Sequence, residues 1–414
     1  MDKIRILVVN QDNEGGVGFY RSNQPHKALE DMYKYKYEIT YNSNVMWDNI
    51  PYLSSFNMIF VKTGVFGEME KFRKAISAMK GFGVKTVLDI DDYWTLPFTH
   101  PMYNSCKQFK IDTIIKDNIK LFDYVITTTE IFADEIRKLN KNVFVIQNAI
   151  DPKNPNFQTN KSSSDRLRIG MIMGSTHYND IISMGNLANK LSKRTLDKIQ
   201  FVLCGFDLRG KVSSIDVKTN QLKQRDLKPE ETVWASYEKF LTDNYSTIGG
   251  NYANFLKMYI PNVQYPMVAN EPYMRCWTKD MDHYFEHYNN VDVLLAPLQN
   301  NTFNRMKSQL KAIECCFSKT ALVASNVGPY TLDLVNFLGG NGKTNENGNA
   351  ILIDEQKNHK MWHKTIERLA DDPDTVKLLQ NNIHESLKEK FDLNNVVKLR
   401  DKIYDTILTA GQQK

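Results

Sequence analysis

The sequence predicts an α/β protein with two parallel sheets in tandem, and three observations lead to this prediction. Short apolar runs rich in β-branched residues alternate with amphipathic stretches at helical spacing. This alternation stops in a polar segment at 154–165 and then starts again. The length of 414 residues exceeds what one hydrophobic core normally supports. Two domains are therefore expected.

The first domain is expected at 1–155. Its predicted strands are Ile4–Val9, Met58–Val61, Thr86–Asp89, Tyr124–Thr127 and Val143–Ile146. Its predicted helices are Glu68–Lys80, Phe109–Leu121 and Glu130–Leu139. Strands and helices that alternate in this way form a parallel sheet covered by helices on both faces, as in a Rossmann-like domain.

A linker is expected at 156–166, and a second Rossmann-like domain at 167–385. Its predicted strands are Leu167–Met173, Ile199–Cys204, Val293–Ala296, Thr320–Ala324 and Ala350–Ile353. The pattern is lost at about 208–260, which reads as an insertion with a helix from Pro229 to Leu241. The tail from His359 to Leu408 is strongly helical, and a break is expected at Asp372 and Pro373.

Composition excludes some classes of function. Lys and Arg outnumber Asp and Glu by 53 to 48, and this excess is too small for the basic stripe of a nucleic-acid binder. Basic residues of the first half could touch an anionic membrane, although such a set is more often an exposed helix side. They are Lys71, Arg73, Lys74, Lys80 and Lys85. With no signal-peptide pattern or membrane-spanning run, we expect a cytoplasmic protein, at most peripheral at the inner face of a membrane.

The five cysteines do not form a recognisable motif. They are Cys106, Cys204, Cys276, Cys315 and Cys316, with no Cys-x-x-Cys pair and no histidine at a spacing typical of zinc sites. Apolar neighbours surround Cys204 and Cys315 in the sequence. Buried free thiols in a reducing compartment are the expected reading, and no metal is predicted.

The segment Asp292–Tyr330 is the most informative part of the chain. It reads as strand, loop, helix and strand, the unit in which a loop at the carboxyl end of a strand brings a ligand to a helix N-terminus. Lys307 and Ser308 fall in the first turn of a helix expected over Phe303–Glu314. The unpaired N–H groups and the helix dipole there favour an anion, and a lysine suits that position only if a phosphate binds.

Further along the same predicted helix, Lys311 and Glu314 share the face of Lys307. Glu314 could accept hydrogen bonds from vicinal hydroxyls. The alternative is a solvated surface with a weak Lys311–Glu314 pair. The opposite, packed face is predicted to hold Met306, Leu310, Ile313 and Phe317.

A glycine-rich loop follows the first strand. Gly15, Gly16 and Gly18 would let backbone N–H groups approach a phosphate or sugar closely. The dinucleotide fingerprint needs a third glycine where this chain has Arg21, so an NAD enzyme is disfavoured. A tight turn without ligand is the alternative for this loop.

Acidic and aromatic residues follow the strand Thr86–Asp89. Asp89 and Asp91 resemble the Asp-x-Asp pattern that can hold a divalent cation, but so short a match carries little weight. We expect instead that Asp91 and Asp92 bind acceptor hydroxyls and that Trp94 offers a stacking surface. The alternative is that Asp92 caps the next segment and Trp94 packs in the core.

Another polar loop, Gly174, Ser175 and His177, closes the first strand of the second domain. Gly174 and Ser175 could donate N–H and hydroxyl groups to a phosphate, and His177 could reach across a cleft. An exposed polar histidine without a catalytic role is the alternative.

In this order the pieces resemble glycosyltransferases of the two-domain GT-B type, in particular the retaining group that includes family 4. The resemblance runs along nearly the whole chain and is carried by the Gly15–Gly18 loop with Tyr20 and Arg21, by Val145–Asp151, by Gly174, Ser175, His177 and Asp180, by Leu295–Leu298, by Phe303–Glu314, by Val323–Ser325, and by Asn347–Asn349 with the tail Leu369–Tyr404.

The resemblance implies a fold and a division of labour. Two Rossmann-like domains would face a central cleft, and a C-terminal helix at 386–414 would cross back to the first domain. The second domain would bind a nucleotide-sugar donor, the first a glycan or lipid-linked acceptor. Transfer would proceed with retention and without cofactor or metal.

The resemblance also implies site residues. Catalytic roles fall to Lys307, Ser308 and His177. Donor contacts are expected from Gly15, Gly16, Gly18, Gly174, Ser175, Asn304, Lys307, Ser308, Lys311 and Glu314, and acceptor contacts from Arg21, Asp91, Asp92 and Trp94.

One departure from the family pattern keeps other functions open. Glu314 would bind the ribose as the second of two family glutamates, but the position of the first is Met306. Asn304, or the backbone near Phe303, would have to replace that donor-sugar contact. A non-catalytic sugar-nucleotide-binding subunit, a GT-B epimerase and a phosphorylase are the alternatives.

Overall fold

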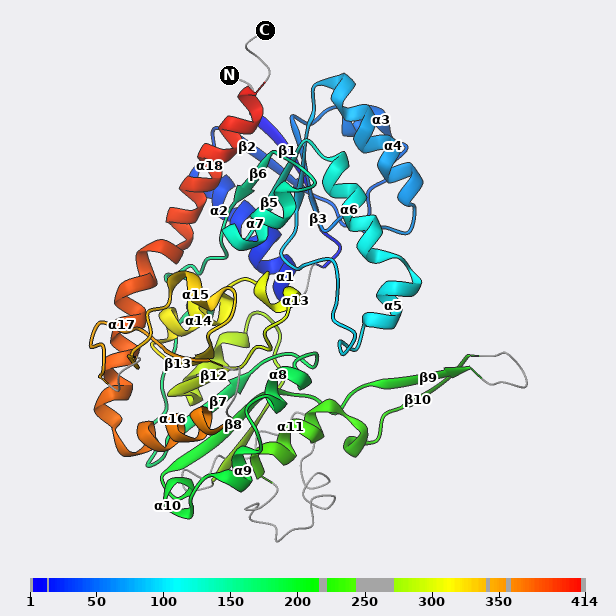
Figure 1. The fold of residues 1–414 in the computed structure, drawn as a ribbon. Helices are drawn as coiled ribbons and strands as arrows, with labels where there is room; N and C mark the ends of the chain where they lie inside the picture. The colour runs from blue at the N-terminus through cyan, green and yellow to red at the C-terminus, as the bar shows by residue number, and fades with distance from the viewer. Residues whose placement is uncertain are drawn as a thin grey trace.

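Two parallel sheets, one above the other in Figure 1, form the body of the protein. The computed structural model describes residues 3–12, 15–215, 222–242, 272–339, 343–354 and 359–410. Each of the two main sheets has six strands, and all neighbouring strands within them run parallel. The prediction of two Rossmann-like domains is confirmed.

The first sheet has the strand order β2-β1-β3-β4-β5-β6. The strands are β1 (Ile4–Val9), β2 (Tyr37–Tyr41), β3 (Met58–Lys62), β4 (Lys85–Asp89), β5 (Tyr124–Thr127) and β6 (Val143–Val145). The helices are α1 (Gly16–Gly18), continued by a π-helix at Phe19–Asn23, then α2 (Gln24–Met32), α3 (Ile50–Leu53), α4 (Met69–Met79), α5 (Tyr103–Gln108), α6 (Ile111–Leu121) and α7 (Glu130–Arg137).

The second sheet has the order β11-β8-β7-β12-β13-β14. The strands are β7 (Leu167–Ile172), β8 (Ile199–Phe206), β11 (Tyr273–Trp277), β12 (Val293–Ala296), β13 (Ala321–Ser325) and β14 (Ile351–Ile353). The helices are α8 (Tyr178–Ile182), α9 (Leu187–Lys190), α10 (Lys193–Leu196), α11 (Val233–Thr242), α13 (Thr302–Arg305), α14 (Leu310–Ser318) and α15 (Tyr330–Asp333), with a 3-10 segment η5 at Tyr284–Asn290.

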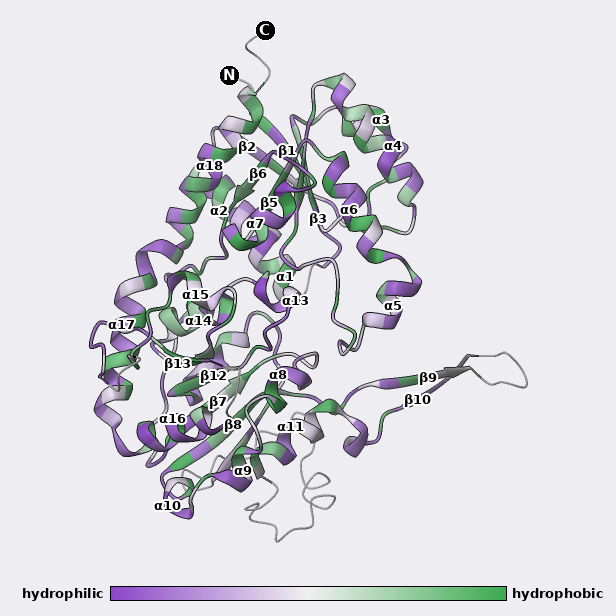
Figure 2. Cartoon of the chain, in the orientation of Figure 1, coloured by the Kyte–Doolittle hydropathy of each residue, from purple (hydrophilic) through white to green (hydrophobic). Residues whose placement is uncertain are grey.

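Central strands are apolar because they are covered on both faces. Every residue of β3, β12 and β13 is buried, and Figure 2 shows hydrophobic residues on the strands and polar residues on the outer helix faces. Burying one large aliphatic or aromatic side chain contributes about 1.5–3 kcal/mol. The run of apolar residues that marks each strand in the sequence therefore also supplies the core.

Three helices end the chain: α16 (Lys360–Asp371), α17 (Pro373–Phe391) and α18 (Leu393–Thr409). The break expected at Asp372 and Pro373 is present, and the Asp372 side chain caps α17 by accepting from the Thr375 N–H. The chain crosses back to the first domain at Asp392, later than the expected boundary at 385/386, which falls inside α17.

Helix α18 packs on the first sheet (Figure 1). Val396, Ile403 and Tyr404 are buried in one cluster with Ile6 and Leu29. The C-terminal helix therefore belongs to the first domain, as the resemblance implies.

The region expected as an insertion contains an antiparallel hairpin, β9 (Lys211–Ile215) with β10 (Leu222–Asp226), which projects from the body in Figure 1. The helix expected at Pro229–Leu241 is present as a short 3-10 turn, η4 (Pro229–Glu231), followed by α11. Residues 216–221 and 243–260 of the expected insertion lie outside the described residues. Within the described part of the chain, no helix combines the length and apolar character that crossing a bilayer requires.

Candidate active site

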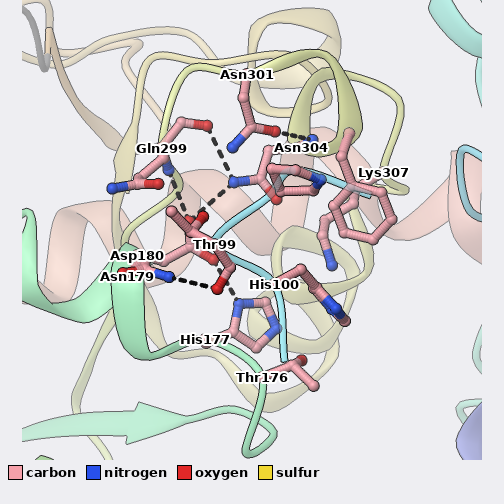
Figure 3. Close-up of a pocket in the computed structure, with 12 residues that line it drawn as sticks. Thr99, His100, Thr176, His177, Asn179, Asp180, Gln299, Asn301, Asn304 and Lys307 are labelled. Atoms are coloured by element: carbon pink, nitrogen blue, oxygen red, sulfur yellow. Dashed lines mark hydrogen bonds and ion pairs between the residues drawn. The ribbon is translucent and has the colours of Figure 1, made fainter. Parts of the chain in front are cut away.

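A pocket lies between the two domains, where three loops meet. The first domain contributes the loop after β4, and the second domain contributes the loops after β7 and β12 (Figure 3). The lining residues are Pro97, Thr99, His100, Thr176, His177, Asn179, Asp180, Gln299, Asn301, Phe303, Asn304 and Lys307. Ligands of open α/β sheets bind at such carboxyl strand ends. About 330 Å³ of space, part of it open to solvent, lies among these residues.

Asp180 organises one wall of this pocket. Its Oδ1 accepts hydrogen bonds from the backbone N–H of Gln299 and from Asn304 Nδ2, both at 2.8 Å. Its Oδ2 lies 2.7 Å from His177 Nδ1. Asp180 therefore joins the loop after β7 to the loop after β12. It forms part of the resemblance, but it was not predicted as a site residue.

The contact with Asp180 also sets the state of His177. Burial lowers the His177 pKa, the nearby Lys307 and Lys311 lower it further, and Asp180 acts in the opposite direction. The ring is therefore neutral at pH 7 and donates its Nδ1 proton to Asp180, so that Nε2 is an acceptor. Figure 3 shows His177, His100 and Lys307 pointing into the same space. The His177 side chain is 22% exposed, so a ligand can reach it.

The helix expected over Phe303–Glu314 is two helices. Helix α13 ends at Arg305 and α14 begins at Leu310, so Lys307 and Ser308 precede a helix rather than lying in its first turn. The physical reason is Met306, which is 6% exposed and packs into the core of the first domain, whereas Ile313 packs into the second. One straight helix would place both on the same face and could not pack them into two different cores, so the predicted packed face is wrong at Met306.

The start of α14 has no side-chain cap. The Gln309 side chain, which stands at the cap position, donates to Asp333 Oδ2 at 2.9 Å instead. Ser308 Oγ accepts from Asn148 Nδ2 of the first domain at 3.1 Å, and its own proton remains available to a ligand. Lys307 Nζ lies 4.8 Å from the centre of the Phe303 ring. The positive charge of Lys307 and the unpaired N–H groups of the first turn therefore lie together at the start of α14.

Two of the predicted acceptor residues are structural. Arg21 is 1% exposed and makes a two-point ion pair with Asp89, at 2.7 and 3.1 Å. It also donates to Asn148 Oδ1 at 3.1 Å, which orients the amide that reaches Ser308. Trp94 is 6% exposed and packs in the core of the first domain. The prediction that Arg21 and Trp94 contact the acceptor directly is wrong, because neither side chain reaches the pocket.

The two other predicted acceptor residues differ from each other. Asp91 Oδ1 pairs with Lys62 Nζ at 2.6 Å, and although burial acts to raise its pKa, Lys62 outweighs burial and the pKa is lowered. Asp92 is exposed. The protein atoms around it raise its pKa, assisted by Asp91, and Lys307 and His177 partly oppose this rise. Asp92 is thus a carboxyl group of the first domain that lies near Lys307 and His177 of the second.

Glu314 is buried among hydroxyl groups. Its Oε2 accepts from Tyr288 at 2.6 Å and from Lys311 Nζ at 2.7 Å. Its Oε1 has one long contact, to Tyr20 of the first domain, at 3.4 Å. The predicted donor residues Glu314 and Lys311 thus lie together, and Glu314 is fully buried.

The predicted phosphate role of the glycine loop is not supported by its geometry. The carboxylate of Asp12 accepts from the N–H groups of Gly15, at 2.8 Å, and Gly18, at 3.2 Å. A methyl group on Gly18 would stand 1.6 Å from the Asp12 carbonyl oxygen. The glycines, Gly16 among them, form a tight turn closed by Asp12, which is the alternative stated for this loop.

The loop after β7 keeps its predicted place. Gly174 and Ser175 are exposed at the carboxyl end of the strand. Their carbonyl groups accept from Tyr237 OH of α11, at 3.3 and 3.0 Å. The helix of the insertion therefore supports a loop of the site, a role that the sequence did not indicate.

The two parallel-sheet domains, the pocket between them and the returning C-terminal helix define the GT-B fold. No family model and no curated protein matches the chain.

Solved structures confirm the fold. Anabaena HepE in complex with UDP and glucose is similar over 97% of this chain and 100% of that chain, with a TM-score of 0.56 and 11% identity. An alpha-glucosyltransferase in complex with UDP and a 13-mer DNA matches over 98% and 100%, with a TM-score of 0.58 and 12% identity. A UDP-forming alpha,alpha-trehalose-phosphate synthase from Burkholderia vietnamiensis matches over 100% and 99%, with a TM-score of 0.57 and 10% identity.

Proposed function

We propose that the chain is a glycosyltransferase that moves a sugar from a nucleoside diphosphate sugar to a hydroxyl group of a glycan or lipid-linked acceptor. One observation carries this proposal: Lys307 lines the pocket in which Asp180 holds a neutral His177, and Ser308 and the uncapped start of α14 follow Lys307 directly in the chain. Asp92 lies opposite, on the first domain. Donor and acceptor would thus meet between the two domains.

The chemistry follows from where charge develops. Departure of a nucleoside diphosphate builds negative charge on phosphate oxygens, and donors aimed there stabilise the transition state more than the ground state. Lys307 supplies a positive charge, Ser308 a hydroxyl donor and α14 its first N–H groups. A metal ion is not needed for this charge balance. His177 Nε2 accepts a hydrogen bond from a sugar hydroxyl, and Asn304 is held beside it by Asp180.

In this proposal transfer proceeds with retention, and the leaving phosphate helps to deprotonate the acceptor hydroxyl that Asp92 binds. Support for UDP as the nucleotide comes from the complexes of HepE and of the alpha-glucosyltransferase. Support for a lipid-linked acceptor comes from exposed apolar residues near His100. Phe98, Met102 and Phe109 are 81%, 52% and 64% exposed.

A panel of UDP, GDP, ADP and dTDP sugars tests the proposal. One member should raise the melting temperature, since a ligand at 100 times its Kd stabilises by roughly 2.7 kcal/mol. The same sugar nucleotide should be hydrolysed slowly to free sugar, and the rate should be unchanged by EDTA. The absence of both binding and turnover across the panel contradicts the proposal.

A non-catalytic sugar-nucleotide-binding subunit is the second candidate, and Met306 favours it. An apolar side chain stands where the resemblance implies a glutamate, and it is packed into the first domain rather than facing the pocket. Such a subunit would bind one sugar nucleotide in the melting experiment and release no sugar from it, with or without candidate acceptors.

A further inference from the structure

A cluster of soft ligand atoms lies in the second domain, apart from the pocket. Cys204 on β8 and Cys276 on β11 are directly paired in the register of these neighbouring strands. His287, from η5, approaches the same place. The two Sγ atoms and an imidazole nitrogen all lie within 4.8 Å of one another.

The histidine of this cluster is buried without a complete set of partners. Cys204 is 0% exposed and His287 is 1% exposed. Among the described residues, His287 Nδ1 is a buried atom that has no hydrogen-bond partner. Buried polar atoms are nearly always paired, so the unpaired Nδ1 shows that His287, which stands beside the two thiols, has a ring nitrogen without its partner.

We propose that Cys204, Cys276 and His287 bind one zinc ion, with water as the fourth ligand. Two cysteines and one histidine are an established ligand set for zinc, and soft thiolates select zinc over magnesium or calcium. Both thiols release their protons to solvent on binding and the imidazole binds in its neutral form, so two thiolates balance the charge of Zn²⁺. Water can enter beside Cys276, which is partly exposed.

The geometry of the cluster suits zinc, which binds cysteine as the thiolate. Tetrahedral zinc with Zn–S bonds of about 2.3 Å places two sulfur atoms about 3.8 Å apart, so small side-chain movements would close the site.

The metal would also fix the surroundings of Glu314. The segment η5 carries His287 together with Tyr284 and Tyr288, and both tyrosine hydroxyls contact Glu314 Oε2, at 3.5 and 2.6 Å. A zinc ion that ties η5 to β8 and β11 would hold these hydroxyls in place. This site does not depend on the proposed transferase activity, because its ligands lie outside the pocket.

Cobalt substitution tests the site in the full chain. The protein is reduced, freed of metal and titrated with Co²⁺, and then Zn²⁺ is added. We expect one equivalent of cobalt, with intense thiolate-to-cobalt absorption that zinc removes, and a melting temperature raised by a few degrees with zinc. Cys276→Ser and His287→Gln should lose the absorption, whereas Cys316→Ser, a change at another buried cysteine, should keep it.

Three results would overturn the proposal. One is folded wild-type protein that takes up neither ion at micromolar concentration. A second is cobalt absorption that survives both ligand variants. If those variants fail to fold, X-ray absorption of the zinc-loaded wild type tests the site instead. The proposal requires that the spectrum show two sulfur ligands and one imidazole. A Cys204–Cys276 disulfide that forms under mild oxidation equally well with and without zinc would also contradict it.

Discussion

Two segments bring backbone N–H groups toward the space between the domains, and they differ in charge. In the glycine loop after β1, the carboxylate of Asp12 already accepts from Gly15 and Gly18. The start of α14 has no side-chain cap and carries Lys307 and Ser308. A helix start or glycine turn attracts an anion only while no protein carboxylate fills it. The diphosphate is therefore expected at α14, and glycine content alone points to the wrong loop.

The largest effect that this comparison predicts is the loss of Lys307. We expect Lys307→Ala to lower kcat by about two to three orders of magnitude, as happens when a main donor to a developing oxyanion is removed. Steady-state kinetics with the donor identified by thermal shift measures the change. Arg305→Ala is the matched control, because Arg305 is an exposed cation two residues away. Equal losses in both variants, or unchanged turnover in Lys307→Ala, would remove Lys307 from the mechanism.

Most of the fold could be predicted from the sequence because central parallel strands are apolar throughout. Strands β1, β5 and β12 begin and end at the same residues as the apolar runs that predict them. The edge strand β2 was missed because Glu38 and Thr40 interrupt its apolar pattern. Strand β11 lies beyond the irregular insertion, so no alternation pointed to it.

The candidate site could be predicted only in part. The loops at strand ends follow from the strands themselves, and the structure brings His177, Lys307 and Asp92 of these loops near one another. Partners that depend on tertiary geometry could not be found. The sequence does not show that the Asp12 side chain accepts from the glycine loop or that Arg21 forms an ion pair with Asp89. It also does not show that the strand register pairs Cys204 with Cys276.

The acceptor side of the crevice should respond to Asp92. Asparagine has the shape of the protonated acid but cannot carry charge, so Asp92→Asn should lower kcat/KM for the acceptor about 10-fold to 100-fold, the usual value of a hydrogen bond to a charged group. Hydrolysis of the donor without acceptor should change little. A variant that loses donor hydrolysis as strongly as transfer would place Asp92 on the donor side instead.

A smaller, pH-dependent effect is expected from His177. Its pKa lies below the ordinary 6.5 because burial and Lys307 disfavour the imidazolium. As the pH falls through this lowered pKa, Nε2 becomes protonated and no longer accepts, so kcat/KM should fall up to tenfold per pH unit. The unfolded chain binds this proton more tightly, so stability also falls as the pH drops below 6.5. In His177→Gln the acid limb should move or disappear, while an unchanged profile would assign it to Asp92.

The smallest effect is predicted for Asp12, and it tests the comparison most directly. Asp12→Asn keeps an oxygen acceptor for the N–H of Gly15, but it replaces the oxygen that accepts from Gly18 with an amide NH2 group and removes the negative charge. If the diphosphate binds at α14, the Kd for the sugar nucleotide, measured by calorimetry, should change less than about threefold, and the free energy of unfolding should fall by about 1 kcal/mol through weaker capping. If the glycine loop were the anion site, removing a competing carboxylate should instead tighten donor binding about tenfold or more, since 1.4 kcal/mol corresponds to a factor of ten. That outcome would reverse the assignment of the two segments.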